Sequence, residues 1–594
     1  MRRTKLYPIA LVLCLITPRP ARTEPLQQVQ ALCPTGAIAS ITIDNHSIFD
    51  TSDPELSGHL RLAYRIANTL HARTRASVVR RDLLFRVGDC FDPTVIAESE
   101  RLLRDNQFLA SATITHRRRD DGDYDLTVTT RDEWSTRIDI RASLGDGPLF
   151  KGASLKESNF LGTGQTVELF YLDYKANRDY GVGYHNHQLG GSHWHLGGTI
   201  GRSRNGPFYL QSLALPFREE SGRWAAREEF RRLDRNFDYL VDDAGAERHL
   251  LLPTRMTAFD VAVIRRLGPP GRQQLTVGAA LGYTRITFPG GGAALRLVEG
   301  DDFDGATPAD PAHFEPIRPQ TTPLHTLRST ILLGQRKIGW VKRSGFDTLR
   351  GEQDIRLGTE TGVALGRSLL APAGPHHLFT ALDLYAATGN DALLLIGRMR
   401  GDAQRALGGG FGWYDIFGEA EGLAYWKPRP EGRHTLVLRA TATGGWETTI
   451  PFQLILGGDL GVRGYPDERF PGGRRVVFSL EDRILLDGPL RNITDLGLTA
   501  FVDLGRIWPG DAPYGTDSGW RASAGLGLRN AFPTGGRRTY RIDFAIPLQP
   551  HTTWRDLRLI LSVGELIGVT PSVRRLRIEE LQRFTPRNPF YFPD

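Results

Sequence analysis

The sequence predicts a mainly β protein, in which a transmembrane antiparallel β-barrel of about 16 strands follows one small α+β domain. Three observations lead to this fold class. Many segments alternate apolar and polar residues with the period of two that a strand requires. No stretch approaches the roughly 20 consecutive apolar residues of a membrane helix. The 66 glycines suit a chain with many turns.

The alternation is clearest in three segments near the C-terminus. In RRVVFSLEDRILL, one face would carry Val476, Phe478 and Leu480, and the other Ser479, Glu481 and Arg483. In LGLTAFVDLGRIW, the second face would carry Asp503. In RRTYRIDFAIPL, it would carry Arg541 and Asp543. We expect these second faces to point away from lipid. Because every backbone group in lipid must be paired, a closed barrel is the β structure that such strands can form.

The barrel should occupy residues 133–568. At about 27 residues for each strand and its loop, this length gives roughly 16 strands, an even number that suits antiparallel closure. The last strand should lie near 555–565, with a C-terminal tail at 569–594, and the polar stretch 289–325 is the best candidate for a long extracellular loop. Tryptophans at strand ends favour a membrane barrel over a soluble two-sheet protein: Trp134, Trp426, Trp508, Trp520 and Trp554.

Residues 1–23 have the pattern of a secretory signal peptide, with a basic start and the apolar core YPIALVLCLI. Its removal leaves two cysteines, Cys33 and Cys90. In an oxidising compartment they could form a disulfide, or they could remain two separate thiols. The sequence leaves both alternatives open.

The small α+β domain should occupy residues 37–132. A strand is predicted over 39–49 and two helical pieces over 60–86. Asp92 is a candidate N-cap for a further helix, with Pro93 in its first turn. Residues 113–130 then predict a hairpin that turns at an Asp-Gly pair.

Four histidines lie close together in YHNHQLGGSHWHLGG. If residues 188–192 form a hairpin loop, His187 faces His193 and His185 faces His195, and all four share one face. Such a group could hold Zn²⁺. The alternative is a polar wall or hairpin rim without metal, and we assign no metal site.

Charge and motifs argue against several classes of function. The net charge of +7 is modest and scattered, and it lacks the arrangement of a nucleic-acid interface. The sequence contains no nucleotide-binding loop, no zinc-protease motif and no serine-hydrolase motif. We therefore expect no enzyme activity, no cofactor and no nucleic-acid partner.

The glycine-rich segment LGGDLGVRGYP, residues 456–466, contains a single arginine, Arg463. A buried arginine needs acceptors, and Glu481 and Asp503 on the following strands are the obvious ones. We expect a loop that folds back into the barrel and is held there by these acids. The alternative is an ordinary hairpin with a surface arginine.

This stretch resembles the outer-membrane insertase and translocase superfamily that includes BamA, TamA and the two-partner secretion transporters. Its Val-Arg-Gly-Tyr/Phe loop is matched by Val462, Arg463, Gly464 and Tyr465, its inner-wall aspartate by Asp503, and its inward glutamate by Glu481. The resemblance implies that Arg463 contacts an acid on the inner wall of the barrel. The charged C-terminal tail departs from the family, whose barrels end on an aromatic residue, and this puts in doubt a gate between first and last strands.

The β-α-α-β-β order of residues 37–132 resembles a POTRA domain, with Gly88, Asn106 and Phe108 at matching positions. Such domains bind extended peptides by strand addition; the alternative is a rigid spacer. The resemblance implies a protein of the Gram-negative outer membrane, with its N-terminal domain in the periplasm, that assists insertion or translocation of polypeptides. Unfolded or partly folded clients, outer-membrane lipid and accessory periplasmic or lipoprotein subunits are the implied partners. The alternatives are a dedicated secretion pore and, less favoured, a passive porin or barrel enzyme.

Overall fold

The computed structural model describes residues 33–563, with gaps at 50, 52–57, 143–149, 175–176, 218–221, 244–245, 269–272, 301–302, 373, 409–411, 430, 459–460, 467–468 and 489–492. The predicted signal peptide at 1–23 and the tail at 569–594 lie outside the described residues. Within the described residues, no helix has the length and apolar character needed to cross a membrane.

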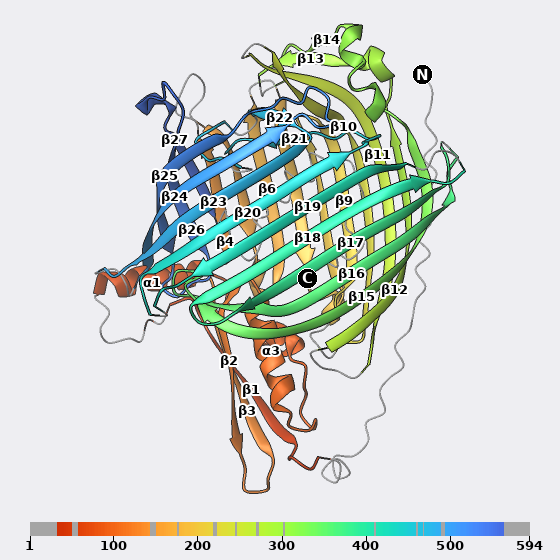
Figure 1. Cartoon of the computed structure of the whole chain (residues 1–594). Helices are drawn as coiled ribbons and strands as arrows, with labels where there is room; N and C mark the ends of the chain where they lie inside the picture. Colours follow the sequence, from red (N-terminus) through yellow and green to blue (C-terminus); the bar gives the residue numbers. More distant parts are fainter. Residues whose placement is uncertain are drawn as a thin grey trace, which may run out of the picture.

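A large antiparallel sheet dominates the molecule (Figure 1). The strands follow one another across the sheet in the order of the chain. The last strand, β27, lies next to the first, β4, so the strand order is circular. The long strands are β4 Thr136–Ala142, β5 Phe150–Glu157, β6 Gln165–Tyr174, β7 Asn177–Asn186, β8 His195–Ser203, β9 Gly206–Leu215, β10 Trp224–Asp243, β11 Ala246–Leu267, β12 Gln273–Thr287, β15 Leu324–Ser344, β16 Glu352–Leu370, β17 His377–Gly389, β18 Leu393–Ala406, β19 Trp413–Trp426, β20 His434–Trp446, β23 Arg474–Leu486, β24 Asp495–Trp508, β25 Arg521–Ala531, β26 Thr539–Pro547 and β27 Arg558–Val563.

The expected number of strands, about 16, is too low for this sheet. Its order includes 22 strands in the described part of the chain, and two of these, β13 Arg296–Glu299 and β14 Thr307–Pro308, are short strands of one loop, which leaves twenty in the wall. The average of about 27 residues for a strand and its loop was too long. The six strands β4 to β9 fit between residues 136 and 215, because each is at most 10 residues long.

The alternation of the C-terminal strands places apolar side chains outside and polar ones inside. On β23, Phe478 and Leu480 are 39% and 50% exposed, whereas Glu481 is completely buried. The same holds on β24, where Val502 is exposed and Asp503 is buried. This is the inverse of a water-soluble barrel and the pattern expected where lipid surrounds the wall.

The N-terminal residues form a separate α+β module. Its elements are β1 Ile38–His46, α1 Gly58–Leu70, α2 Ala76–Asp82, α3 Pro93–Asp105, β2 Leu109–Arg118 and β3 Tyr124–Asp132. The sheet order is β1-β3-β2, with β1 parallel to β3 and β2 antiparallel to it. Asp92 caps α3 by accepting a hydrogen bond from the Thr94 backbone N–H, as its place before Pro93 predicts.

The two ends of the barrel carry different structures (Figure 1). The N-terminal module lies against one end, which we call the module end. The longest connections lie at the opposite, far end. They are the segments 288–323, 447–473 and 509–520, and the first of them includes the stretch predicted as a long loop.

Candidate functional site

The loop that carries Arg463 folds into the barrel from the far end. Its two arms pair as a short hairpin of β21 Leu454–Leu456 and β22 Phe470–Gly472. Val462 and Tyr465 pack with the apolar side chains of this hairpin and with Val477 and Ile507 of the wall. Burial of these side chains holds the loop inside the lumen.

Gly464 is required by the position of the loop on the wall. Its φ of +99° lies in the region that side-chain-bearing residues avoid. A Cβ there would lie 3.0 Å from the carbonyl carbon of Ile546 and 3.2 Å from Cβ of Ser523. The glycine therefore allows the backbone to approach β25 and β26 closely.

Arg463 is 4% exposed and makes several contacts at once. Its Nε and Nη2 donate to the two carboxylate oxygens of Asp503 at 2.7 and 2.8 Å, and its backbone N–H donates to the same group at 3.1 Å. Its Nη1 donates to Glu481 at 2.7 Å. The guanidinium also lies 3.5 Å from the ring centroid of Phe501. Bidentate geometry of this kind fixes both position and orientation.

The structure thus brings Arg463 together with both acids that the sequence singled out. Glu481 and Asp503 lie on the neighbouring strands β23 and β24, where Ser479 is opposite Asp503 and Glu481 opposite Phe501. The two carboxylates are therefore diagonal neighbours on the inner face. We call Arg463, Glu481 and Asp503 the latch.

Two further arginines surround the latch and were not selected from the sequence. Arg541 donates to Glu481 at 3.1 Å and to Asp543 at 2.9 Å, and Arg483 donates to Glu481 at 2.9 Å. Three arginines thus face three carboxylates in the lumen. Such a balance is needed because an unpaired buried charge is costly. The sequence could have identified these residues, because the period-two alternation places Arg483, Arg541 and Asp543 on the inner faces of their strands.

The cluster continues into the turn between β15 and β16. Arg483 donates to the carbonyl oxygen of Phe346 at 2.8 Å, and the hydroxyl of Tyr425 donates to the Asp347 carboxylate at 2.6 Å. Arg529 and Thr539 donate to the backbone carbonyl of Asp347. This turn, residues 345–351, therefore folds inward from the module end and meets the charge cluster.

The N-terminal module contacts the same region of the wall. Arg104 of α3 donates from Nε and Nη2 to the two oxygens of Asp354, both at 2.9 Å, and the pair is largely buried. Arg101 lies over the ring of Trp340 at 3.7 Å. Contacts thus run from the module through the start of β16 and its turn to the latch.

A second set of contacts attaches the module to the early turns of the barrel. Gln188 donates to the Val78 carbonyl at 3.2 Å, and Asn159 donates to the Thr74 hydroxyl at 2.8 Å. Glu133, at the junction with β4, accepts from the backbone N–H of Arg537 at 3.1 Å. Burial raises the pKa of this carboxyl, against the opposing effect of that hydrogen bond and of the nearby arginines.

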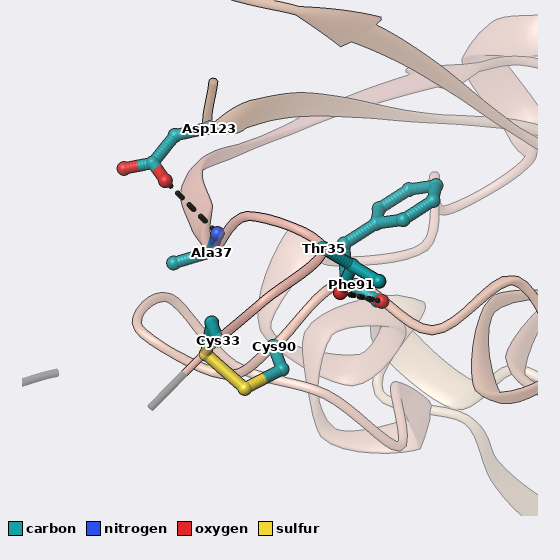
Figure 2. The surroundings of a disulfide bond; sticks show 6 residues. All are labelled: Cys33, Thr35, Ala37, Cys90, Phe91 and Asp123. Carbon is teal, nitrogen blue, oxygen red and sulfur yellow. Dashed lines mark hydrogen bonds between the residues drawn. A yellow bond between two sulfur atoms is a disulfide. The ribbon is translucent and has the colours of Figure 1, made fainter. Parts of the chain in front are cut away.

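A disulfide joins Cys33 and Cys90 in the module, with their Cα atoms 5.1 Å apart (Figure 2). The chain beside it is held by two hydrogen bonds, from the Thr35 hydroxyl to the Phe91 carbonyl and from the Ala37 N–H to Asp123. The bond therefore connects the start of β1 to the segment that leads into α3.

The histidine hairpin has a different register from the expected one. His185 lies opposite Gly197 rather than His195, because residues 187–194 form the connection and include a short 3₁₀ turn. His187 stacks on His185 with a centroid distance of 4.7 Å and meets His195 edge-on at 5.0 Å. Burial, together with His195 and Lys156, lowers the pKa of His187 to about 4, so this ring is neutral at pH 7. In the described part of the chain, no group of three or more potential ligands is placed to hold a metal ion.

The loops at the far end of the barrel are joined by hydrogen bonds. Gln453 bonds to the N–H and carbonyl of Leu240 and donates to the carbonyl of Pro513. Gln320 accepts from the Tyr239 hydroxyl and from the Phe452 N–H. We call these loop contacts the far-end cap. They tie three loops to β10 and to one another.

Comparison with known proteins identifies one domain. Residues 419–565 match the Omp85 superfamily domain, and this range contains the latch. None of the curated proteins compared with the chain matches it.

Solved structures of similar proteins include three of low identity. BamA from Haemophilus ducreyi lacking POTRA domains 1–3 is 12% identical, with 88% of this chain and 83% of that chain covered and a TM-score of 0.36. CdiB from Acinetobacter baumannii is 12% identical, with 89% and 74% covered and a TM-score of 0.38. CdiB from Escherichia coli is 12% identical, with 93% and 92% covered and a TM-score of 0.33.

Proposed function

We propose that this chain, whose residues 419–565 match the Omp85 superfamily domain, assists the insertion or translocation of polypeptides at the outer membrane of a Gram-negative bacterium. The observation that carries this proposal is the buried latch, in which Arg463 of an inward-folded loop binds Asp503 and Glu481 of the wall. A loop held in this way gives the barrel an internal part that can move as a unit when the ion pairs break.

The parts of the protein lie in different compartments in this proposed function. The circular sheet spans the outer membrane as a closed barrel, since its outer face is apolar and its inner face is polar. The α+β module, residues 37–132, acts as a POTRA-like domain in the periplasm and the far end faces the exterior. The predicted signal peptide and the Cys33–Cys90 disulfide agree with export to an oxidising compartment.

The module would receive the client. In the order β1-β3-β2, strand β2 is at an edge of the sheet, where an extended polypeptide can add by main-chain hydrogen bonds. Unfolded or partly folded polypeptides are the proposed clients, lipid the second partner, and accessory periplasmic or lipoprotein subunits further ones. Binding and conformational change are sufficient for this activity, so we propose no enzyme chemistry and no cofactor.

A dedicated pore for one secreted partner is the second candidate. It shares the barrel and module with the first and differs in the number of clients. A passive porin is less favoured, because a loop folds into the lumen and the loops of the far-end cap are bonded to one another.

The test is depletion of the protein in its host, with quantitative proteomics of isolated outer membranes. Broad loss of barrel proteins would indicate a general insertase, and loss of one or a few surface or secreted proteins a dedicated translocase. Complementation by Arg463→Ala should fail to restore the lost proteins. Arg506→Ala is the matched control, because Arg506 pairs with Asp517 in an exposed position of the same domain. Unchanged membranes on depletion would reject the proposed function.

A further inference from the structure

Helix α1 is attached to the barrel through one face. Tyr64 stacks on Phe49 with a centroid distance of 4.1 Å, and the Asn68 side chain makes hydrogen bonds to both the N–H and the carbonyl of Phe49. Phe49 in turn lies 5.3 Å from Phe532, in the turn between β25 and β26. Trp134, just before β4, packs on the same cluster. The helix therefore lies beside the start of β4 and the turn that precedes β26.

The opposite face of α1 exposes two large apolar side chains. At about 100° per residue, Leu62 and Ile66 lie on the side of the helix away from Tyr64 and Asn68. They are 56% and 52% exposed. Arg61 and Arg65 lie one turn apart on the flank between the two faces. The helix is thus amphipathic, and the edge of its apolar arc at Leu62 and Ile66 is turned away from the protein.

The orientation of α1 sets it apart from the rest of the module. Figure 1 shows the helix lying crosswise at the module end, beside the ends of the last strands and projecting to the side of the barrel, whereas β1, β2 and β3 extend away from it. A helix that lies crosswise at this end of the barrel follows the surface of a surrounding bilayer. The nearby outer wall is apolar, with Leu526 and Leu528 at 67% and 50% exposed.

We infer that α1 is an interfacial helix that rests on the periplasmic leaflet of the outer membrane, beside the strands β26, β27 and β4. This inference rests on the proposed function, because it requires the barrel to span that membrane. Leu62 and Ile66 enter the boundary between headgroups and acyl chains and extend the apolar outer surface of the barrel. Arg61 and Arg65 lie at the level of the lipid phosphates. An amphipathic helix with basic residues beside its apolar stripe is the form that binds a phospholipid surface.

The experiment uses the full mature chain, from which the predicted signal peptide with Cys14 is absent, reconstituted in phosphatidylethanolamine and phosphatidylglycerol vesicles. Because Cys33 and Cys90 are joined, Leu62→Cys or Ile66→Cys provides one free thiol for an environment-sensitive dye. Thr115→Cys, exposed on β2, is the aqueous control, and Leu526→Cys on the outer wall is the lipid control. Brominated lipids are the quencher, and heat-modifiable migration on gels verifies folding of each variant.

Dyes at Leu62 and Ile66 should show blue-shifted emission and be quenched by brominated lipid as the Leu526 dye is, whereas the Thr115 dye should not. Quenching at Leu526 with aqueous emission at both helix positions would overturn the inference and leave the proposed function intact. Aqueous emission at Leu526 itself would mean that the barrel does not lie in lipid, and both proposals would fall. Arg61→Gln with Arg65→Gln should reduce the blue shift most in vesicles rich in phosphatidylglycerol.

Discussion

Arg104 of α3 and Asp354 of β16 form a two-bond ion pair across the junction of the module and the barrel, although 250 positions separate them in the sequence. Arg104 also donates to Glu100 and to the carbonyl of Ala112, so its guanidinium is held from both sides. The pair fixes how α3 lies against the wall. It also brings the module to the start of β16, next to the turn that contacts the charge cluster.

Replacement of Arg104 should loosen this junction. Arg104→Ala leaves the largely buried Asp354 without its partner, which should cost about 3 kcal/mol. Hydrogen exchange of α3 and of residues 345–351 should then accelerate. Arg117→Ala is the control, because Arg117 is 83% exposed in its pair with Asp125 and should contribute little. Equal exchange in the two variants would show that the Arg104–Asp354 pair does not hold the module.

The latch should contribute strongly to the stability of the barrel. Arg463→Ala leaves Glu481 and Asp503 short of one cation in the lumen, and breaking a buried pair in this way costs about 3–5 kcal/mol. Arg463→Lys keeps the charge but cannot donate two parallel bonds to Asp503, so it should be intermediate. The temperature at which the folded, fast-migrating band disappears on gels measures this order. A melting temperature for Arg463→Ala equal to that of Arg506→Ala would contradict it.

The sequence predicts the latch well because two local rules determine it. The period of two decides which side chains of β23 and β24 share the lumen, and adjacency of those strands brings Glu481 and Asp503 together. Neither rule predicts the position of Asp347, because this residue lies in a turn that folds into the lumen, and a turn has no period of two. The predicted register of β7 and β8 was wrong for a related reason. The connection between these strands is longer than the predicted loop of residues 188–192, and a change of register alters every residue pair.

Gly464 provides a test of the close approach between loop and wall. Gly464→Ala requires a positive φ in a side-chain-bearing residue and places a methyl group against Ile546 and Ser523, at a cost of about 1–3 kcal/mol. Gly422→Ala on β19 is the matched control, since a Cβ there meets nothing within 4 Å. Hydrogen exchange of residues 461–465 should rise only in the first variant. Equal protection in both would mean that the loop can shift without loss of the latch.

The far-end cap should limit ion flow through the barrel. Gln453→Ala removes three hydrogen bonds that join its loop to β10 and to Pro513, and it leaves the buried backbone groups of Leu240 without that partner. Conductance across planar bilayers should rise in amplitude or in open time. Gln549→Ala, at an exposed position of another far-end connection, should conduct like the unchanged protein. If Gln453→Ala also conducts at that level, another segment closes the lumen.

The disulfide should stabilise the module and leave the barrel unaffected. Cys33 and Cys90 are 57 positions apart, and a cross-link over a loop of this length restricts the unfolded chain by about 2–4 kcal/mol. Cys33→Ser with Cys90→Ser should therefore make residues 33–132 more susceptible to protease, while the heat-modifiable band of the barrel stays at its original temperature. A reducing agent should reproduce this effect in the unchanged protein and add nothing to the double variant. A fall in the melting temperature of the barrel would instead show that folding of the module supports the wall, through Arg104 and the contacts at Gln188 and Glu133.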